Sequence, residues 1–373
     1  MNKSPLLPAL GGLLATAAAI GIGRFVYTPI LPPMVEALHL SKSQAGVIAS
    51  VNFLGYLAGA LLAAVRLPGS QRQWLLAALA TNVVCLAGMG LTDHLALFLG
   101  LRALAGVASA FGLIFASALV LNRLAASGHG ALSAVHFAGV GTGIAASAIL
   151  VAALVDWRTM WLASAALALV ASLAVVVLVP ADRAGAAAHR HEKTKFPRSF
   201  WSLLVAYGLF GFGYIITATF IVDMVRGTKE IAGLEPYIWV MFGLSAAPSV
   251  ALWTGLARRF GILHAFALAC ATEAVGVAAS ALFLNPVTVV LTSVFVGGTF
   301  MGLTALGLLG AREGEGDPRG RIALMTASFS FGQILGPVFA GHVYDATGSL
   351  AGPSLVAAGA LVIAAGLSLR RPP

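Results

Sequence analysis

The most constraining feature of this chain is a succession of long apolar runs separated by short polar segments. A transmembrane helix needs about 20 apolar residues, and the runs lack the alternation of membrane β-strands. Twelve runs can be marked, at residues 6–33, 44–65, 74–91, 95–121, 131–154, 160–179, 200–223, 236–256, 262–284, 287–309, 322–344 and 352–369. The sequence therefore predicts an all-α membrane protein with twelve transmembrane helices, the first of them retained and not cleaved as a signal peptide.

Composition excludes several classes of protein. Charged residues make up 9% of the chain and hydrophobic residues 59%, with a mean hydropathy of +0.95, whereas about 25% charged residues is usual in soluble domains. This excludes a soluble enzyme, a disordered chain and an ordinary nucleic-acid binder, despite a pI of 10.1. Cys85 and Cys270 are isolated in apolar runs, which predicts neither a disulfide framework nor a metal site. No cofactor is expected.

Basic residues predict the orientation in the membrane. With the N-terminus placed inside, sixteen Lys and Arg fall on inner segments, and the outer segments hold only Lys42, Arg158, Arg226 and Lys229. Cytoplasmic loops carry such an excess of positive charge. Both termini are therefore expected in the cytoplasm, with the protein in the cell inner or plasma membrane.

The chain has an internal repeat. Gly21-x-Gly23 recurs as Gly211-x-Gly213, 190 residues later, with Tyr214 in the place of Arg24. Gly139-x-x-x-Gly143 in the fifth run matches Gly332-x-x-x-Gly336 in the eleventh, and Asp156 matches Asp345. Parallel repeats of six helices imply a pseudo-two-fold axis along the membrane normal and a binding site between the halves. We expect an N-terminal six-helix bundle at 1–179, a basic cytoplasmic linker at 180–198 and a C-terminal six-helix bundle at 199–373.

These motifs resemble those of a known transporter family. The stretch Gly21-Ile22-Gly23-Arg24-Phe25-x-Tyr27-Thr28-Pro29-x-Leu31-Pro32-x-Met34, followed by Asn52-Phe53-x-Gly55-Tyr56, is similar to the YbfB/YjiJ-like branch of the major facilitator superfamily, as is Gly213–Phe220. The resemblance covers essentially the whole chain. It implies the major facilitator fold, with two pseudo-symmetric six-helix bundles, alternating access and transport of a small solute. It also implies that the first, fourth, seventh and tenth helices line a central cavity.

The chain departs from superfamily patterns in two loops. The loop after the second helix normally carries Gly-x-x-x-Asp-Arg, which holds the cytoplasmic gate closed. Here residues 65–72 read VRLPGSQR, without an acid, and the loop after the eighth helix, at 258–261, reads RRFG. These loops are not expected to form the usual cytoplasmic gate contact.

Arg24 is the sharpest candidate for a substrate contact. A charged side chain at the centre of a bilayer costs at least roughly 2.5 kcal/mol, so it should face the protein interior or a water-filled cavity. In a continuous helix, Tyr27 and Thr28 would share its face. The alternative is an Arg paired to a helix end or to a carboxylate for packing. Arg102, in an Arg-x-x-x-Gly motif of the fourth helix, is a second candidate, with a structural or proton-coupling role as its alternative.

Charge balance points to an anion. Glu273 is the only acid placed deep in a span, against two intramembrane Arg residues. A guanidinium binds carboxylates and phosphates bidentately, so a small organic anion is the expected substrate. Glu273 and His136 are candidates for proton coupling, each with a structural role as the alternative.

Four further residues are candidates for the cavity wall. Tyr214 and Thr217 occupy the repeat positions of Arg24 and Tyr27, and Asn52 and Tyr56 form a polar pair at i and i+4 on the second helix. These eight substrate-binding candidates are Arg24, Tyr27, Thr28, Arg102, Tyr214, Thr217, Asn52 and Tyr56.

The sequence thus predicts a secondary transporter, expected to be proton-coupled, that moves a small solute. An exporter of amphipathic compounds or drugs is the alternative within transport, and a membrane receptor or sensor is the alternative of another class. No HExxH, Walker or Ser/His/Asp arrangement indicates an enzyme or an ATP-driven pump. The expected partners are a small-molecule substrate and the lipid bilayer, with no nucleic acid, and the protein is expected to be a monomer.

Overall fold

The computed structural model describes residues 4–65, 67–179, 196, 198–313 and 319–369. These residues form helices joined by short loops, with no strand among them. The first half contains α1 (Leu6–Thr16), the π-helix η1 (Ala17–Ile22), α2 (Tyr27–Leu38), α3 (Lys42–Ala63), α4 (Gln71–Leu91), α5 (Leu95–Ala126), the 3₁₀ turn η2 (Gly130–Leu132), α6 (Ser133–Ala152) and α7 (Trp157–Leu178).

The second half is also helical throughout. It contains α8 (Arg198–Arg226), the 3₁₀ turn η3 (Ala232–Leu234), α9 (Glu235–Ala246), α10 (Ser249–Phe260), α11 (Ile262–Leu282), α12 (Pro286–Gly310), α13 (Arg319–Thr347) and α14 (Ala351–Leu369).

The number of spans agrees with the sequence. Within the described residues, eleven helices are long and apolar enough to cross a membrane, and a bent pair makes the twelfth. Two spans are interrupted where the sequence predicts continuous helices. The first, Leu6–Leu38, contains the π-helix and a turn, and the eighth bends by 42° between Ala246 and Ser249. Pro248 stands at that bend, where a proline removes a backbone donor.

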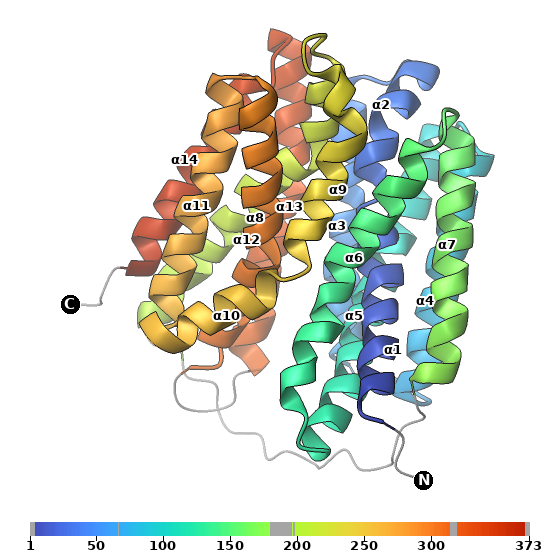
Figure 1. Ribbon diagram of the computed structural model, residues 1–373, viewed down its shortest axis with the longest axis vertical. Coiled ribbons are helices and arrows are strands. Elements are labelled where there is room, and N and C mark those ends of the chain that lie inside the picture. Colours follow the sequence, from blue (N-terminus) through green and yellow to red (C-terminus); the bar gives the residue numbers. More distant parts are fainter. Residues whose placement is uncertain (1–3, 66, 180–195, 197, 314–318, 370–373) are drawn as a thin grey trace.

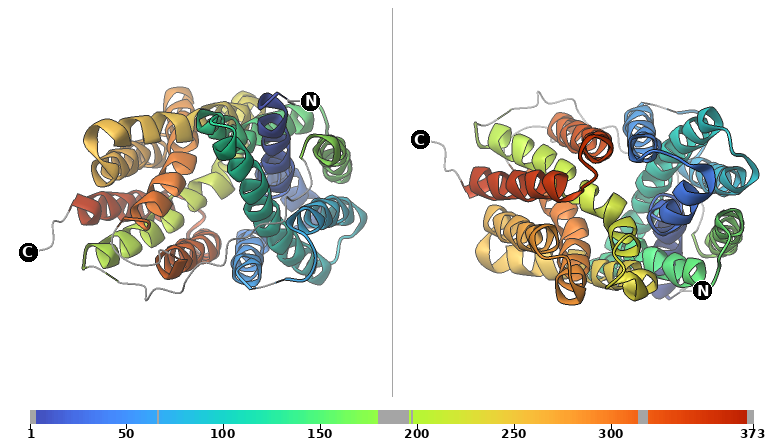
Figure 2. Two further views of the ribbon diagram at one scale, coloured as in Figure 1. Left: turned by 90° about the horizontal axis from the view of Figure 1, so that it is seen from below. Right: turned by 90° about the horizontal axis from the view of Figure 1, so that it is seen from above.

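The helices form two groups that lie side by side (Figure 1). In the first group α5 packs against α3 and α4, and α1 against α6; in the second, α8 packs against α13 and α14, and α11 against α12. Views along the bundle show the same two groups (Figure 2). The basic segment predicted as the linker, 180–198, lies outside the described residues except for Phe196 and the backbone at 198.

We call the end of the molecule that holds the start of α1 the inner end and the opposite end the outer end, following the predicted topology. The α2–α3, α6–α7 and α13–α14 connections lie at the outer end (Figure 1). Local sequence explains where helices begin there. Ser41 and Gln44 form a capping box at α3. The carboxylate of Asp156 accepts hydrogen bonds from the backbone N–H and hydroxyl of Thr159, which hold its pKa below the ordinary value.

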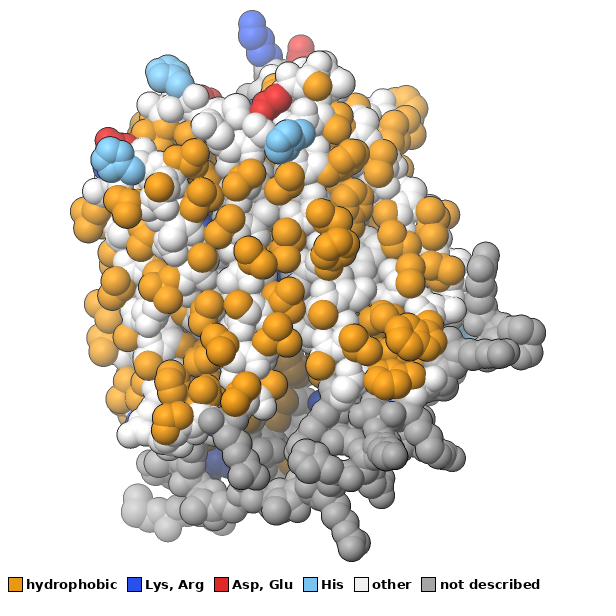
Figure 3. Space-filling view, turned by 180° about the vertical axis from the view of Figure 1, so that it is seen from behind, with side chains coloured by type: hydrophobic (Ala, Val, Ile, Leu, Met, Phe, Trp, Pro, Cys, Tyr) orange, Lys and Arg blue, Asp and Glu red, His pale blue; other side chains and the backbone are white. Residues whose placement is uncertain are grey.

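Contacts between the halves are concentrated toward the outer end. They join α3 to α13, α6 to α9, and α2 to α8. The α6–α9 crossing depends on glycine: a Cβ added to Gly141 would lie 2.3 Å from the backbone nitrogen of Ala247. Within the part of the chain described, α5 has no substantial contact with a helix of the second half. Seen from behind, the apolar surface is indented between the halves toward the inner end (Figure 3).

Candidate functional site

The site is built around the interruption in the first span. The π-helix Ala17–Ile22 ends in a turn that separates it from α2. Such segments leave backbone carbonyls without helical partners, and in a membrane these must be satisfied by other groups. Ser109 on α5 donates to the carbonyl of Ala19 at 2.7 Å, and Asn82 on α4 donates to that of Ala18 at 2.9 Å. Side chains of neighbouring helices therefore stabilise the break.

Arg102 contributes to the same support. Its guanidinium donates to the carbonyl oxygens of Gly23 and Arg24 at 3.5 and 3.3 Å and lies 4.9 Å from the centre of the Tyr27 ring. The side chain is 2% exposed. Its contacts thus join α5 to the turn that carries Arg24.

Arg24 points from this turn toward the second half. Its Nη2 donates to Oε1 of Gln333 on α13 at 2.9 Å. The guanidinium also lies over the rings of Phe53 and Tyr56, 4.3 and 4.7 Å from their centres, an arrangement that stabilises a cation. Its Nε has no hydrogen-bond partner. Among the described residues no carboxylate pairs with Arg24, so no anionic side chain there balances its charge.

Gln333 connects Arg24 to Tyr214 on α8. Its Nε2 donates to the Tyr214 hydroxyl, while its Oε1 accepts from Arg24. The Tyr214 ring stacks on Phe300 and Phe329, with centroids 5.6 and 5.9 Å apart. A series of hydrogen bonds that starts at Arg24 in the first half thus ends at the aromatic cluster of Tyr214, Phe300 and Phe329 in the second half.

Gln333 was not predicted from the sequence. It is an uncharged amide, and its one signal is its place between Gly332 and Gly336 of the repeated motif. An amide in an apolar span needs hydrogen-bond partners, so this position could have been selected as a polar group of the interior.

Tyr27 and Thr28 do not share the partners of Arg24. The Tyr27 hydroxyl donates to the carbonyl of Ala45 at 2.9 Å, and the Thr28 hydroxyl donates across the halves to that of Ala218 at 2.7 Å. Arg24 therefore has polar partners different from those of Tyr27 and Thr28, and it lies in the turn between η1 and α2, directly before Tyr27. All three residues are nevertheless buried around the same junction.

Of the other residues predicted to line the cavity, some pack helices together and others lie beside Arg24 and Tyr214. Tyr56 lies against Arg24. Asn52 donates to the carbonyl of Arg102 at 2.9 Å, which ties α3 to α5, and its Oδ1 has no partner. The Thr217 hydroxyl, on α8 beside Tyr214, is buried without a partner. The structure therefore places Tyr56 directly against Arg24 and joins Arg24 to Tyr214 through Gln333.

Glu273 and His136 lie apart from this chain of contacts. Glu273 on α11 is fully buried, with its Oε2 2.6 Å from the Thr299 hydroxyl and its Oε1 unpartnered. His136 on α6 lies 2.9 Å from the Ser117 hydroxyl through Nε2. Neither forms a hydrogen bond to Arg24, Gln333 or Tyr214 within the described part of the chain. No three His, Cys, Asp or Glu side chains there come together as a metal site requires.

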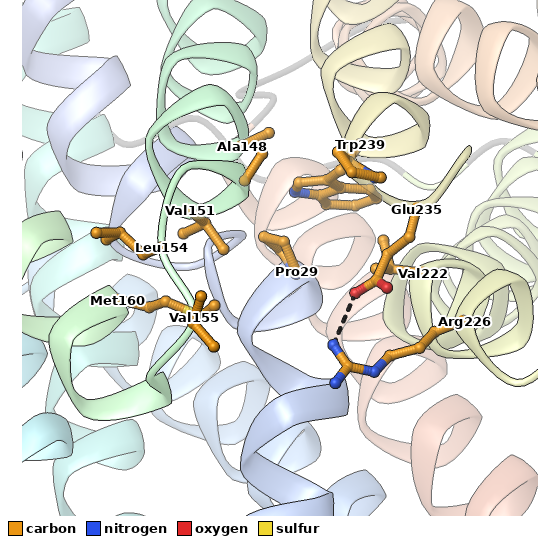
Figure 4. A pocket seen from close by; sticks show the side chains of 12 residues that line it. Pro29, Ala148, Val151, Leu154, Val155, Met160, Val222, Arg226, Glu235 and Trp239 are labelled. Carbon is orange, nitrogen blue, oxygen red and sulfur yellow. Dashed lines mark hydrogen bonds and ion pairs between the residues drawn. The ribbon is translucent and has the colours of Figure 1, made fainter. Parts of the chain in front are cut away.

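A separate pocket of about 220 Å³ lies between the halves at the outer end (Figure 4). Its walls are aliphatic apart from Trp239 and an ion pair. Arg226 donates to Glu235 at 3.1 Å along one edge of the pocket. The same guanidinium donates twice to Glu36 of α2, at 2.8 and 2.7 Å, so Arg226 joins the two halves.

Comparisons with known proteins agree with this architecture. Residues 16–369 match the family model described as "Uncharacterised MFS-type transporter YbfB". A chloramphenicol resistance protein of Streptomyces lividans is 28% identical, with 94% of each chain covered.

Solved structures of transporters share the fold. The nucleoside transporter NupG, as its D323A mutant, superposes with a TM-score of 0.74 at 15% identity, covering 97% of this chain and 99% of that one. A bacterial homologue of the human lysosomal transporter Spinster, in an inward-facing and unoccupied conformation, gives 0.69 at 14% identity over 99% and 96%. The expectation of the major facilitator fold is thereby confirmed. With its family model matched over nearly the whole length, this chain belongs to the YbfB-like family of MFS-type transporters and is a membrane transporter, not an enzyme.

Proposed function

We propose that this protein is a secondary transporter for a small organic anion and that Arg24 is the residue that binds the anionic group. The observation that carries the proposal is the lack of any carboxylate partner for Arg24 among the described residues, although the side chain is only 6% exposed. A buried, uncompensated charge is unfavourable. An anionic solute would remove that penalty.

The neighbouring groups suit such a solute. An Arg guanidinium binds carboxylate and phosphate oxygens in pairs, and the Nε of Arg24 is unpartnered. Gln333 and Tyr214 add an amide and a hydroxyl, and the stack of Tyr214 on Phe300 supplies an apolar wall. In the bound state we expect the anion to displace the Gln333 oxygen from Arg24.

A solute held in this way touches both halves. Arg24 comes from the first half, and Gln333 and Tyr214 from the second. Binding would therefore change how the halves approach each other, as alternating access requires. We expect the solute path to be lined by Tyr56, by Thr217 and by the unpartnered side-chain oxygen of Asn52. Arg102 and Tyr27 position the turn that carries Arg24.

For coupling to protons we propose Glu273 over His136. The Thr299 hydroxyl lies 2.6 Å from the carbonyl of Phe295 and 2.6 Å from Glu273. A hydroxyl has one proton to donate. If Thr299 donates to its own helix, the short contact with Glu273 requires a protonated carboxyl group, and no basic side chain pairs with Glu273 in the described residues.

Binding measurements on purified protein test whether the ligand is an anion and whether Arg24 binds it. Thermal unfolding is followed with carboxylates, phosphate monoesters and matched neutral analogues, because a ligand that binds the native state raises its stability. The proposal expects stabilisation by anions in the wild type and its loss in Arg24→Gln. Arg158→Gln, at an exposed ion pair with Asp93, is the control. Stabilisation confined to neutral or cationic compounds would reject the proposal.

Export of amphipathic compounds is the second candidate. Tyr214, Phe300, Phe242 and Trp239 form a continuous series of ring contacts beside Arg24, and one relative carries the name chloramphenicol resistance protein. Expression of the chain in a drug-sensitive bacterium distinguishes the two. Export predicts higher tolerance that survives Arg24→Gln and is lost in Tyr214→Ala.

We also propose that the protein works as a monomer in the cell inner or plasma membrane with both termini in the cytoplasm. The distribution of basic residues supports this orientation. Accessibility of single cysteines placed at Ala37 and Arg259, near opposite ends, would test it with an impermeant thiol reagent.

A further inference from the structure

The contacts between the halves differ between the two ends of the molecule. At the outer end, the carboxylate of Asp345, near the end of α13, accepts hydrogen bonds from the backbone N–H groups of Lys42 and Ser43, both at 3.0 Å. These N–H groups belong to the first turn of α3, where the helix dipole favours a negative charge. Asp345 of one half therefore caps a helix of the other. Its repeat equivalent, Asp156, caps α7 within its own half.

Two ion pairs add to this cap. Nζ of Lys42 lies 2.6 Å from Oδ1 of Asp223, with side chains only 15% and 12% exposed. Arg226 binds both carboxylate oxygens of Glu36, at 2.8 and 2.7 Å. Such bidentate and partly buried pairs are stronger than ordinary surface pairs. Three polar contacts thus join the halves at this end, two of them through Lys42.

The inner end shows a different pattern. Where both partners are described residues, every hydrogen bond between the halves lies at Arg24 or on its outer side. The loop sequences VRLPGSQR and RRFG lack the acid with which a cytoplasmic gate contact would form. Among the hydrogen bonds between described residues, those that could favour one conformation are therefore at Arg24 or on its outer side.

We propose that Glu36, Lys42, Asp223, Arg226 and Asp345 form an outer latch that makes the form closed at the outer end the resting state of this transporter. The inference rests on the proposed transport cycle, since opening toward the outside requires all of these contacts to break. The latch closes the end at which α2, α3, α8 and α13 meet, and the solute site lies directly inside it. Transport in either direction then passes through a step in which Asp345 leaves the α3 terminus.

Distances between spin labels test the latch without any substrate. One label pair replaces Ala37 on α2 and Lys229 after α8, at the outer end; a second replaces Ala126 on α5 and Arg259 on α10, at the inner end. All four positions are exposed. Cys85 and Cys270 are replaced by alanine in every variant. The variant Asp345→Asn removes the charge that caps α3, and Asp93→Asn, at an exposed ion pair within the first half at the same end, is the matched control.

The proposal expects the population with a long outer distance to rise at least tenfold in Asp345→Asn, with a matching shortening at the inner end. Asp93→Asn should keep the wild-type distributions. Unchanged distributions in a folded Asp345→Asn would overturn the latch. The pair Lys42 and Asp223 gives a second test: Lys42→Asp alone should open the outer end, and adding Asp223→Lys should reclose it. An outer end that stays open in the double variant would also contradict the proposal.

These outcomes are separable from those of the proposed function. Label distances that respond to the latch variants, together with a failure of anions to bind, would reject the anion and keep the latch. Anion binding at wild-type affinity, together with label distances that do not respond to the latch variants, would reject the latch and keep the anion.

Discussion

Glu36 and Arg226 form a bidentate ion pair, and they stand 190 positions apart in the chain. The same offset relates Gly21 to Gly211 in the internal repeat, and it also relates Thr28 to Ala218, which share a hydrogen bond of 2.7 Å. Equivalent residues of two repeats can touch only close to the axis that relates them. The two halves therefore meet about their pseudo-two-fold axis at the outer end, directly beyond Arg24.

Replacing Gln333 by Glu should weaken anion binding. The new carboxylate would lie where the amide oxygen now accepts from Arg24 at 2.9 Å, and it would neutralise the guanidinium that the solute needs. Loss of one charge-assisted hydrogen bond of about 1.5–3 kcal/mol lowers affinity by roughly 10–100-fold. Isothermal titration calorimetry measures this fall in affinity, with the anion that gives the largest stabilisation in the thermal screen. Gln333→Met removes the amide without adding charge, and it should bind more tightly than Gln333→Glu; equal affinities would argue against a charge effect.

Replacing Gly141 by Ala should push the two halves apart where α6 crosses the end of α9. The added Cβ would lie within 2.3–2.5 Å of the backbone of Ala247 and Gly243, and backbone atoms at a helix crossing cannot move aside as a flexible side chain can. We expect a longer outer distance between labels at Ala37 and Lys229. Gly100→Ala is the control, because no atom lies within 4 Å of its added Cβ. A Gly141→Ala protein with wild-type distances would show that this crossing does not limit closure.

Replacing Arg102 by Met should destabilise the protein. The change leaves the carbonyls of Gly23 and Arg24 without their donors, and an unsatisfied buried polar group costs about 1–3 kcal/mol. A fall in the midpoint of thermal unfolding measures the effect, and substrate affinity should fall with it because the turn positions Arg24. The same substitution at Arg123, near the inner end of α5, should leave both quantities close to wild type.

Replacing Glu273 by Gln should remove the dependence of transport on a pH gradient while the protein stays folded. A glutamine is close in shape to a protonated glutamate and can keep the contact with Thr299, now at 2.6 Å, but it cannot release a proton. Flux into vesicles with and without an imposed pH gradient measures it. Glu230→Gln, at an exposed loop position, serves as the reference. A pH-gradient response that persists in Glu273→Gln would assign coupling elsewhere.

The spans and the position of Arg24 could be predicted from sequence because both follow from the cost of polar groups in a bilayer. The break before α2 could not be predicted, since a π-helix becomes stable only when side chains of other helices, such as Ser109 and Asn82, satisfy its carbonyls. That break also explains why Tyr27 does not share the partners of Arg24. The spacing of residues along the sequence describes a single helix, whereas these contacts depend on the packing of three helices.

The latch could not be predicted for a related reason. In the sequence, Lys42 and Arg226 are recognisable only as basic residues of outer segments. Glu36 and Asp223 lie on other helices, so no spacing along one helix connects them to their partners. One pair did carry a signal in the sequence. Glu36 and Arg226 are separated by the offset of the internal repeat, so they occupy equivalent positions in the two halves.

Anion flux through Arg24 is the measurement that tests the central claim most directly. Purified wild type and Arg24→Gln are reconstituted in liposomes, and uptake of a labelled organic anion is compared with that of its neutral amide or ester. The account predicts saturable anion uptake in the wild type, little uptake of the neutral analogue, and loss of anion uptake in Arg24→Gln with folded protein retained. Equal uptake of the anion and its neutral analogue, or full anion uptake by Arg24→Gln, would contradict it.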